Sequence, residues 1–271
     1  MKKKIKIFDT NFSHSIYSSD FQNSESIEWV RNFEFNPDEI HFLTDNYLFS
    51  NIEGKNLIGW LLEPRGINPT QYERIKNEHS KFKTVLTYDK ELIETNDKFE
   101  FYPHCGCWIK PEDQKIYEKT KLVSYISSTK NFGAQGHNLR SEVREKINKN
   151  VDSFGRGHNP LDYKLDGLKD YMFSIVIENS KFDYYFTEKI MDCFTTGTIP
   201  IYWGCPSIGD FFEKESILSF ETYEELEKIL SEITPEMYFS KIESVKKNYK
   251  KSKEYLLSED WIYKNTKIFN L

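Results

Sequence analysis

The residues best suited to chemistry lie in the second half of the chain, where a polar segment separates two apolar ones. Residues 173–177 form an apolar run of strand length, and Glu178 and Asn179 follow it directly. Farther along, Glu188 and Lys189 lie at the start of a segment with a helical pattern. Carboxylates hold sugar hydroxyls or take up protons, and a lysine beside them balances the charge of a phosphate. Because open α/β sheets bind ligands at the carboxyl ends of their strands, this segment predicts a ligand site.

A capped helix must position the second part of this segment. Thr187 is suited to cap a helix that ends at Gly197, and residues 198–203 then return as a second apolar strand. A lysine in the first turn is unfavourable, because a helix N-terminus carries partial positive charge. We therefore expect an anion to offset Lys189, and a diphosphate fits the free N–H groups there. The alternative is that Lys189 is simply solvated on an exposed first turn, which would be the better interpretation of residues 187–189 (Thr-Glu-Lys) taken alone.

The same residues resemble a known family. The pattern ENS-x6-TEK-I-x-D, followed by TIPIYWG-x-PS, resembles the donor-sugar signature of the α1,3/4-fucosyltransferases, which transfer L-fucose from GDP-fucose to an oligosaccharide hydroxyl. Residues 123–129 and 137–144 resemble the family's upstream strand and helix. By this resemblance the donor is held by Arg140, Glu178, Asn179, Tyr185, Thr187, Glu188 and Lys189. Glu178 can instead buttress the loop by accepting buried backbone N–H groups. Arg156, between two glycines, is a further phosphate candidate or part of an ordinary loop.

The resemblance also implies a catalytic base in the first half. The segment 59–64, GWLLEP, resembles the family's Glu-Ser-Pro segment, so that Glu63 corresponds to the glutamate that takes the acceptor proton. The serine is missing here. If Glu63 is not the base, acidic residues near Asp45 and Glu53 are the next candidates. Trp60, Arg65, His104 and Trp108 are candidates for the acceptor cleft, but the sequence does not identify the acceptor or the linkage position.

Alternating strand and helix patterns predict an α/β protein. The resemblance implies two Rossmann-like domains facing across a cleft, an arrangement called GT-B. We expect an acceptor-side domain over 1–117, a donor domain over 118–250, and a helical segment over 251–271 that crosses back to the first domain. Expected strands are 4–8, 39–43, 56–62, 82–88, 99–103, 122–127, 173–177, 198–203 and 216–220, and expected helices are 26–32, 69–81 and 138–148.

Composition narrows the function class. The chain has 271 residues and a net charge of −6, which argues against general nucleic-acid binding because the phosphate backbone requires a basic face. The five lysines between 246 and 253 are typical of a solvated helix face, with contact to an anionic membrane or glycan as the functional alternative. No apolar run reaches 18 residues, so no transmembrane helix is expected. The N-terminal sequence MKKKIKIF has lysines before apolar residues, but its apolar part is too short for a signal peptide. Together with the resemblance, the lack of such segments predicts a cytoplasmic bacterial or viral enzyme. The alternative is a cytoplasmic enzyme that binds peripherally to the inner face of the membrane.

We expect no essential cofactor or metal. Glycosyltransferases of the other common architecture use paired acidic residues to hold a cation, and no convincing Asp-x-Asp occurs here. The four cysteines show no spacing typical of the disulfides of secreted proteins, and no second cluster of ligands joins Cys105 and Cys107, so buried or loop thiols are expected. Two other functions remain open: a GT-B transferase using a different nucleotide sugar, and a non-catalytic glycan-binding protein. The joint presence of Glu63, Arg140, Glu188 and Lys189 disfavours the second.

Overall fold

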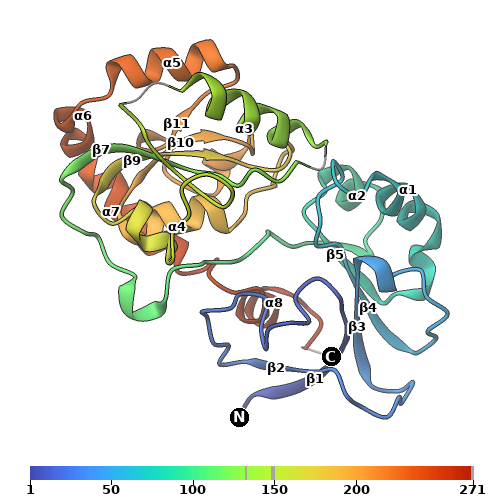
Figure 1. Cartoon of the computed structure of the whole chain (residues 1–271). Helices are drawn as coiled ribbons and strands as arrows, with labels where there is room; N and C mark the ends of the chain where they lie inside the picture. The colour runs from blue at the N-terminus through green and yellow to red at the C-terminus, as the bar shows by residue number, and fades with distance from the viewer. Residues whose placement is uncertain (132, 148–149, 270–271) are drawn as a thin grey trace.

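Strands of two to seven residues build two parallel sheets, and the chain completes the first sheet before it begins the second. The computed structural model describes residues 1–131, 133–147 and 150–269. The first sheet has the order β2-β1-β3-β4-β5-β6 and the second the order β11-β10-β9-β7-β8. We call the parts built on them the first and second domains (Figure 1). The strands are β1 (Lys3–Phe8), β2 (Ile27–Val30), β3 (Ile40–Thr44), β4 (Asn56–Trp60), β5 (Thr84–Thr87), β6 (Phe99–Phe101), β7 (Lys121–Ile126), β8 (Asp152–Phe154), β9 (Tyr171–Ile177), β10 (Ile199–Trp203) and β11 (Leu218–Ser219).

The predicted α/β class is confirmed, and one predicted helix is wrong. Each of the nine expected strands is present with shifted ends. Residues 26–32, expected to be helical, contain strand β2, which pairs in parallel with β1. The reason is visible in the burial of the side chains, because Ile27 and Trp29 are buried while Glu28 and Val30 are partly exposed. That alternation has the period of a strand. The short strand β8 was not predicted.

Helices cover both faces of the second sheet. Alternate residues of β9 point to opposite faces: Val176 shares an apolar cluster with Ile190 of α4, whereas Ile175 shares one with Val143 of α3. The predicted helix 69–81 is α1 followed by a 3-10 turn, and the predicted helix 138–148 is α3, with Asn148 outside the described residues. The helices are α1 (Pro69–Glu78), α2 (Lys90–Thr95), α3 (Gln135–Lys146), α4 (Glu188–Thr196), α5 (Tyr223–Glu232), α6 (Pro235–Ser240), α7 (Ile242–Ser252) and α8 (Ser258–Asn265).

The two domains share apolar packing. Phe42 and Trp60 of the first domain belong to the same buried cluster as Ile190 and Phe194 of α4. The segment that connects the sheets runs over residues 102–120 and ends in a buried lysine, Lys119. Its ammonium donates to the carbonyl oxygens of Leu168, Lys169 and Thr196 and to the hydroxyl of Thr198, at 2.9 to 3.1 Å. This contact ties the connecting segment to the C-terminal end of α4.

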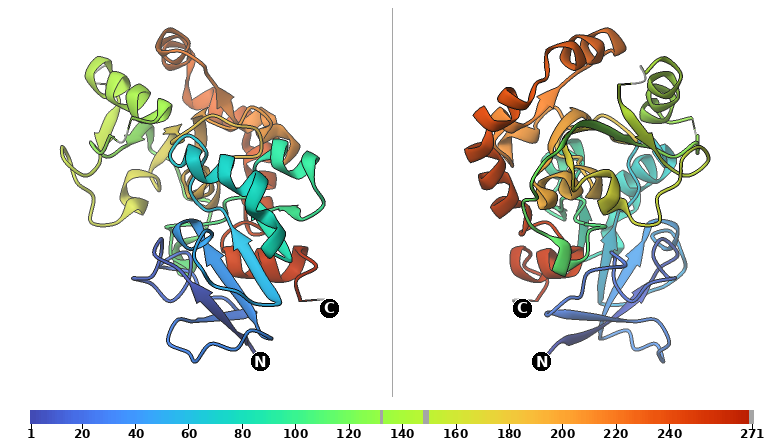
Figure 2. Two further views of the ribbon diagram at one scale, coloured as in Figure 1. Left: turned by 90° about the vertical axis from the view of Figure 1, so that its right-hand side faces the viewer. Right: turned by 60° about the vertical axis from the view of Figure 1, so that its left-hand side comes forward.

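The last helix returns to the first domain. Helix α8 packs beside β2, below the second domain in Figure 1, and the views of Figure 2 agree. The buried carboxylate of Glu259 accepts hydrogen bonds at 2.7 Å from the backbone N–H and from the hydroxyl of Ser18, and another at 2.5 Å from the indole of Trp29. These bonds anchor the loop that follows β1. Residues 270 and 271 of the expected segment 251–271 lie outside the described residues.

The lysine-rich helix α7 pairs its charges with carboxylates. Lys246 lies 2.6 Å from Glu243, and Lys251 lies 2.7 Å from Glu254. An anionic surface would have to compete with these glutamates. Within the described ranges, no helix combines the length and apolar character needed to cross a bilayer. The four cysteines, as expected, are buried free thiols.

Candidate active site

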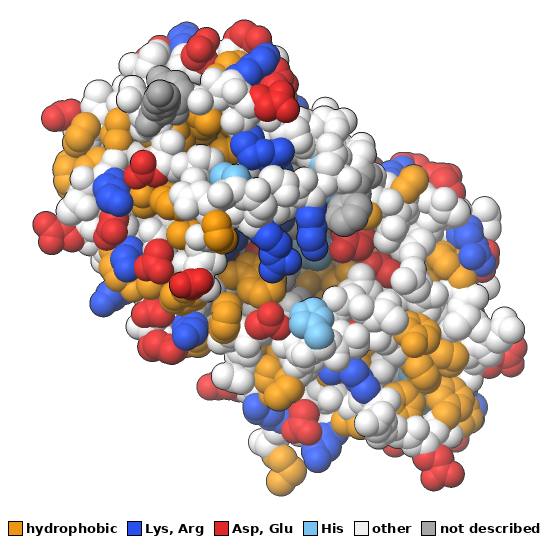
Figure 3. All heavy atoms as spheres, in the orientation of Figure 1, with side chains coloured by type: hydrophobic (Ala, Val, Ile, Leu, Met, Phe, Trp, Pro, Cys, Tyr) orange, Lys and Arg blue, Asp and Glu red, His pale blue; other side chains and the backbone are white. Residues whose placement is uncertain are grey.

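Two cavities meet at the start of α4. The first, of about 280 Å³, lies at the carboxyl ends of β7, β8 and β9. The second, of about 290 Å³, lies between the two domains. Glu188 and Lys189 line both cavities. In Figure 3 the surface is hollowed between the two halves, and lysine and arginine side chains gather at this hollow. We call the first the donor cavity and the second the interdomain cavity.

The turn from β9 into α4 is built on Glu178. This side chain is fully buried, and its two carboxylate oxygens accept from the backbone N–H and the hydroxyl of Thr187, at 2.9 and 2.7 Å. The Thr187 hydroxyl in turn accepts from the N–H of Lys189, so that Thr187 caps α4 as predicted. Gly197 ends the helix at φ +72°, where a residue without a Cβ is favoured. Glu178 therefore buttresses the loop, one of the two roles considered for it.

Two carboxylates offset the lysine in the first turn. The ammonium of Lys189 lies 3.0 Å from Glu188 and 3.4 Å from Glu178. Burial opposes ionisation of Glu188, but the charges of Lys189 and Lys164 outweigh it and hold the pKa of this carboxyl well below its usual range. The sequence led us to expect an anion here. The protein itself supplies that charge, and Lys189 still faces both cavities.

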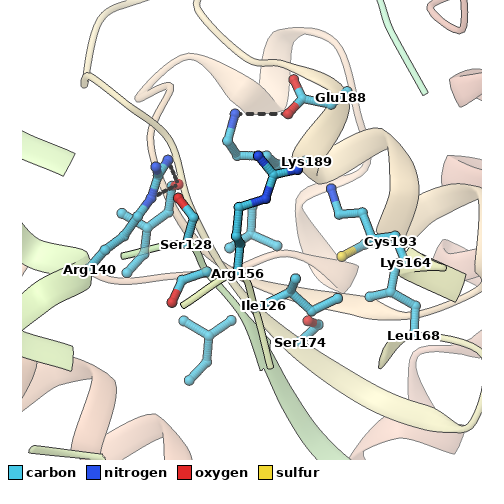
Figure 4. Close-up of a pocket in the computed structure, with 15 residues that line it drawn as sticks. Ile126, Ser128, Arg140, Arg156, Lys164, Leu168, Ser174, Glu188, Lys189 and Cys193 are labelled. Atoms are coloured by element: carbon cyan, nitrogen blue, oxygen red, sulfur yellow. Dashed lines mark hydrogen bonds and ion pairs between the residues drawn. The ribbon is translucent and has the colours of Figure 1, made fainter. Parts of the chain in front are cut away.

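Arg140 links α3 to the strand end. The side chain is 8% exposed, and its Nε donates to the carbonyl oxygen of Ile177 at 2.9 Å. Its Nη2 donates to the same carbonyl and, at 2.9 Å, to the side-chain oxygen of Asn179. These bonds fix the guanidinium at the edge of the donor cavity, on the side away from Lys164 (Figure 4). Asn179 lines the interdomain cavity.

Two further cations line the donor cavity. Arg156, noted as a phosphate candidate, extends into the middle of the view in Figure 4. Lys164 was not predicted, since nothing distinguishes it in a polar stretch. Its ammonium lies 2.5 Å from the buried Asp192, whose other oxygen accepts the N–H of Trp108 at 2.7 Å. Burial lowers the pKa of Lys164, but Asp192 and Glu188 raise it more, so this lysine stays charged.

The first domain contributes Glu63 to the interdomain cavity, together with His104 and Trp108. Among the described residues, no hydrogen bond or ion pair reaches the Glu63 carboxylate. Tyr185 closes the same cavity from the second domain, with its ring 5.8 Å from that of His104 and perpendicular to it. Burial raises the pKa of Tyr185 well above its usual value, so its hydroxyl stays protonated.

Two of the residues suggested for the acceptor cleft lie elsewhere. Trp60 is fully buried and packs against Phe12 and Tyr102 in the apolar core, because it points inward from the end of β4. Arg65 pairs with Asp89 at 2.9 Å and with Glu91 at 2.8 Å, outside both cavities. The other two, His104 and Trp108, do line the interdomain cavity.

The site residues thus fall into two groups. Of the residues predicted to be catalytic or to bind the donor, those that line the donor cavity are Arg140, Glu188 and Lys189, and those that line the interdomain cavity are Glu63, Asn179, Tyr185, Thr187, Glu188 and Lys189. Glu178 lies behind them. Within the part of the chain that the structure describes, no three His, Cys, Asp or Glu side chains are grouped to hold a metal ion.

Comparison with known proteins connects this geometry to a family. The family model described as "Glycosyltransferase family 10 (fucosyltransferase) C-term" matches residues 116–263. A "Putative fucosyltransferase-like protein" of Arabidopsis thaliana is 32% identical over 119 residues, 42% of this chain and 23% of that protein. The "Alpha-(1,3)-fucosyltransferase FucT" of Helicobacter pylori is 29% identical over 140 residues, 49% of this chain and 28% of that protein. The chain therefore matches about a quarter of the length of these curated relatives.

Solved structures show the fold of most of the chain. A crystal structure of an α1,3-fucosyltransferase with GDP-fucose superposes with a TM-score of 0.53 at 17% identity, over 89% of this chain and 81% of that one. One with GDP gives a TM-score of 0.56 at 17% identity, over 89% and 82%. The two-domain arrangement is thus GT-B, as expected. Because the matched family model covers more than half of the chain, including every donor-side residue named above, this protein belongs to glycosyltransferase family 10, the fucosyltransferases.

Proposed function

We propose that this protein is an inverting fucosyltransferase that moves L-fucose from GDP-fucose to a hydroxyl group of an oligosaccharide, with an α1,3-type linkage. The observation that carries the proposal is the junction of two cavities at Glu188 and Lys189. One cavity is rich in cations, and the other presents a carboxylate from the opposite domain. A transferase needs this pairing, because the donor and acceptor must meet at one reacting carbon.

The donor cavity suits a nucleoside diphosphate. Arg140, Arg156, Lys164 and Lys189 line a space of about 280 Å³. In GDP-fucose, negative charge builds on the leaving diphosphate as the bond to fucose breaks, and fixed cations stabilise that charge most in a site with little water. The planar fork of an arginine also matches phosphate oxygens in pairs. Glu188 stays ionised beside these cations and is placed to hold ribose or fucose hydroxyls.

The interdomain cavity suits the acceptor. An acceptor hydroxyl is too weak an acid to attack unaided, so a carboxylate within hydrogen-bond reach must take its proton in the transition state. Glu63 fills this role in our proposal, because it lines the cavity from the first domain, opposite Lys189. Displacement from the face opposite the diphosphate turns the β-linked donor sugar into an α-linked product. Glu63 lies outside the segment matched by the family model, so its role rests on this geometry and on the resemblance of its segment.

Activity measured with a panel of substrates tests the proposal. We expect transfer from GDP-fucose, and not from UDP-linked sugars, to one or more acceptors ending in N-acetylglucosamine, galactose or glucose. The product linkage, determined by NMR, should be an α-fucoside at a sugar 3-hydroxyl. Efficient transfer from another nucleotide sugar, with none from GDP-fucose, would contradict the proposed donor.

A further inference from the structure

Asp45 holds the peptide that carries Glu63. Strands β3 and β4 are parallel neighbours with Thr44 opposite Trp60, so the residues that follow them leave the sheet at the same edge. Asp45 follows β3 directly. One of its carboxylate oxygens accepts the N–H of Leu62 at 2.8 Å, and the other accepts the N–H of Glu63 at 3.0 Å. A single side chain therefore fixes two successive backbone amides at the proposed base.

Other contacts complete this arrangement. The side-chain amide of Asn11 donates to Asp45 at 2.8 Å, from a loop that lines the interdomain cavity. The hydroxyl of Tyr72 in α1 donates to the carbonyl oxygen of Glu63 at 2.8 Å. Both backbone polar groups of Glu63 are thus held by side chains. Its carboxylate is left to face the cavity.

Asp45 combines an unfavourable backbone conformation with a buried carboxylate. Its backbone has φ +25°, a region that residues other than glycine rarely adopt. Its side chain is 1% exposed, and burial raises its pKa to about 7, although the N–H donors of Leu62 and Glu63 oppose that shift. An unusual backbone conformation and a buried carboxylate at one position favour a functional reason for both.

We propose that Asp45 is a positioning residue for fucosyl transfer: its carboxylate holds the Leu62 and Glu63 amides so that the Glu63 carboxylate faces the acceptor hydroxyl. The inference rests on the function proposed above. Asp45 does not itself act as the base, because both of its oxygens already accept hydrogen bonds and it does not line the interdomain cavity. The sequence suggested the region of Asp45 as an alternative source of the catalytic base, and we instead propose a positioning role for this residue.

The arrangement makes the rate sensitive to pH. When Asp45 takes up a proton, one of its oxygens becomes an O–H donor. The N–H groups of Leu62 and Glu63 are also donors, so the protonated oxygen no longer accepts a hydrogen bond from them. The groups that face this peptide are the Glu63 carboxylate, the Tyr72 hydroxyl and His104, whose ring contacts the Leu62 carbonyl. We therefore expect kcat to fall as the pH falls through about 7, where one of the two amides, that of Leu62 or that of Glu63, loses its acceptor.

The variant Asp45→Asn tests this role. Asparagine keeps the shape but offers one acceptor oxygen in place of two. We expect kcat to fall by roughly tenfold to a hundredfold, because small displacements of a reacting group cost that much. GDP affinity, measured by calorimetry, should stay within about twofold of the wild-type value, and the loss of kcat near pH 7 should disappear.

Glu100→Gln is the matched control, since Glu100 lies in the same sheet, has a pKa that burial also raises, and lines neither cavity. Its rate and pH profile should match the wild type.

Three results would overturn the inference. The first is wild-type kcat in Asp45→Asn. The second is a fall of kcat near pH 7 that persists unchanged in Asp45→Asn, which would assign the pH dependence to another group. The third applies even if Asp45→Asn does not fold: a wild-type kcat that stays level from pH 8 to pH 6. A wild-type protein that transfers no fucose at any pH contradicts the proposed function itself.

Discussion

The ammonium of Lys189 lies 3.4 Å from the buried carboxylate of Glu178, and the same carboxylate accepts both the N–H and the hydroxyl of Thr187. One glutamate at the end of β9 thus fixes the cap of α4 and the lysine in its first turn. This explains how a helix N-terminus tolerates a cation there. It also means that the donor cavity is organised by a residue that does not line it.

Replacing Glu178 by glutamine should weaken the fold and the site together. Glu178→Gln keeps the shape but removes the charge opposite Lys189 and one acceptor for Thr187. We expect the free energy of unfolding to fall by about 1–3 kcal/mol, as for other buried hydrogen bonds to charged groups. Urea denaturation measures this. The exposed Glu78→Gln loses only a surface pair with Arg74 and should lower the free energy of unfolding much less. Equal effects of the two changes would contradict the buttressing role.

Removing either main donor-side cation should weaken GDP binding. Arg140→Ala and Lys189→Ala each delete a charge at the donor cavity, and charge-assisted contacts to phosphate are worth about 1.5–3 kcal/mol. We expect the Kd for GDP, from calorimetry, to rise by roughly tenfold or more in each variant. Lys246→Ala, on the exposed face of α7, is the control and should bind like the wild type. Unchanged affinity in both cavity variants would place the diphosphate elsewhere.

Fucosyl transfer should not require a divalent cation. Arg140, Arg156, Lys164 and Lys189 line the donor cavity, and in our proposal they supply the positive charge that a metal provides in other transferases. We expect the rate in EDTA to stay within about twofold of the rate without it. Loss of activity in EDTA, with recovery on adding Mn²⁺, would show that these cations are insufficient.

Lys119 should make stability depend on pH. Burial lowers the pKa of Lys119 to about 7 in the folded protein, whereas in the unfolded chain it keeps the ordinary lysine pKa of 10.5. Between these values the unfolded state binds more protons, so this group makes the free energy of unfolding rise with pH from 7 to 9. Lys119→Met should remove that contribution and also lower stability, because four oxygen acceptors lose their donor. Denaturation at pH 7 and pH 9 measures both effects. An identical pH slope in the variant would contradict this explanation.

Local patterns were sufficient to predict much of this structure. The strand ending at Ile177, the Thr187 cap and the Gly197 terminus depend on neighbours in the chain, so residue types alone indicated them. Residues 26–32 show where such reasoning fails, since a four-residue strand between loops has too short a pattern to separate its period of two from a helical one. Pairing with β1 decides the conformation there.

Contacts between distant segments could not be predicted. Lys164 and Asp192 are 28 positions apart, and Trp108, which shares that carboxylate, comes from the segment that connects the two sheets. Asp45 meets the Glu63 amide only because β3 and β4 are neighbours in the sheet. The sequence led us to both Asp45 and Glu63 as acidic candidates. It contained no signal that one of them holds the backbone of the other.

The central claim is that a carboxylate from the first domain takes the acceptor proton while the second domain holds the donor. The most direct test compares turnover with GDP affinity in Glu63→Gln, which keeps the side chain's shape and removes its basicity. We predict that turnover falls by roughly a hundredfold or more while the Kd for GDP stays near the wild-type value. Glu53→Gln, an exposed change in the same domain, should leave both unchanged. Undiminished fucose transfer by Glu63→Gln would contradict the account.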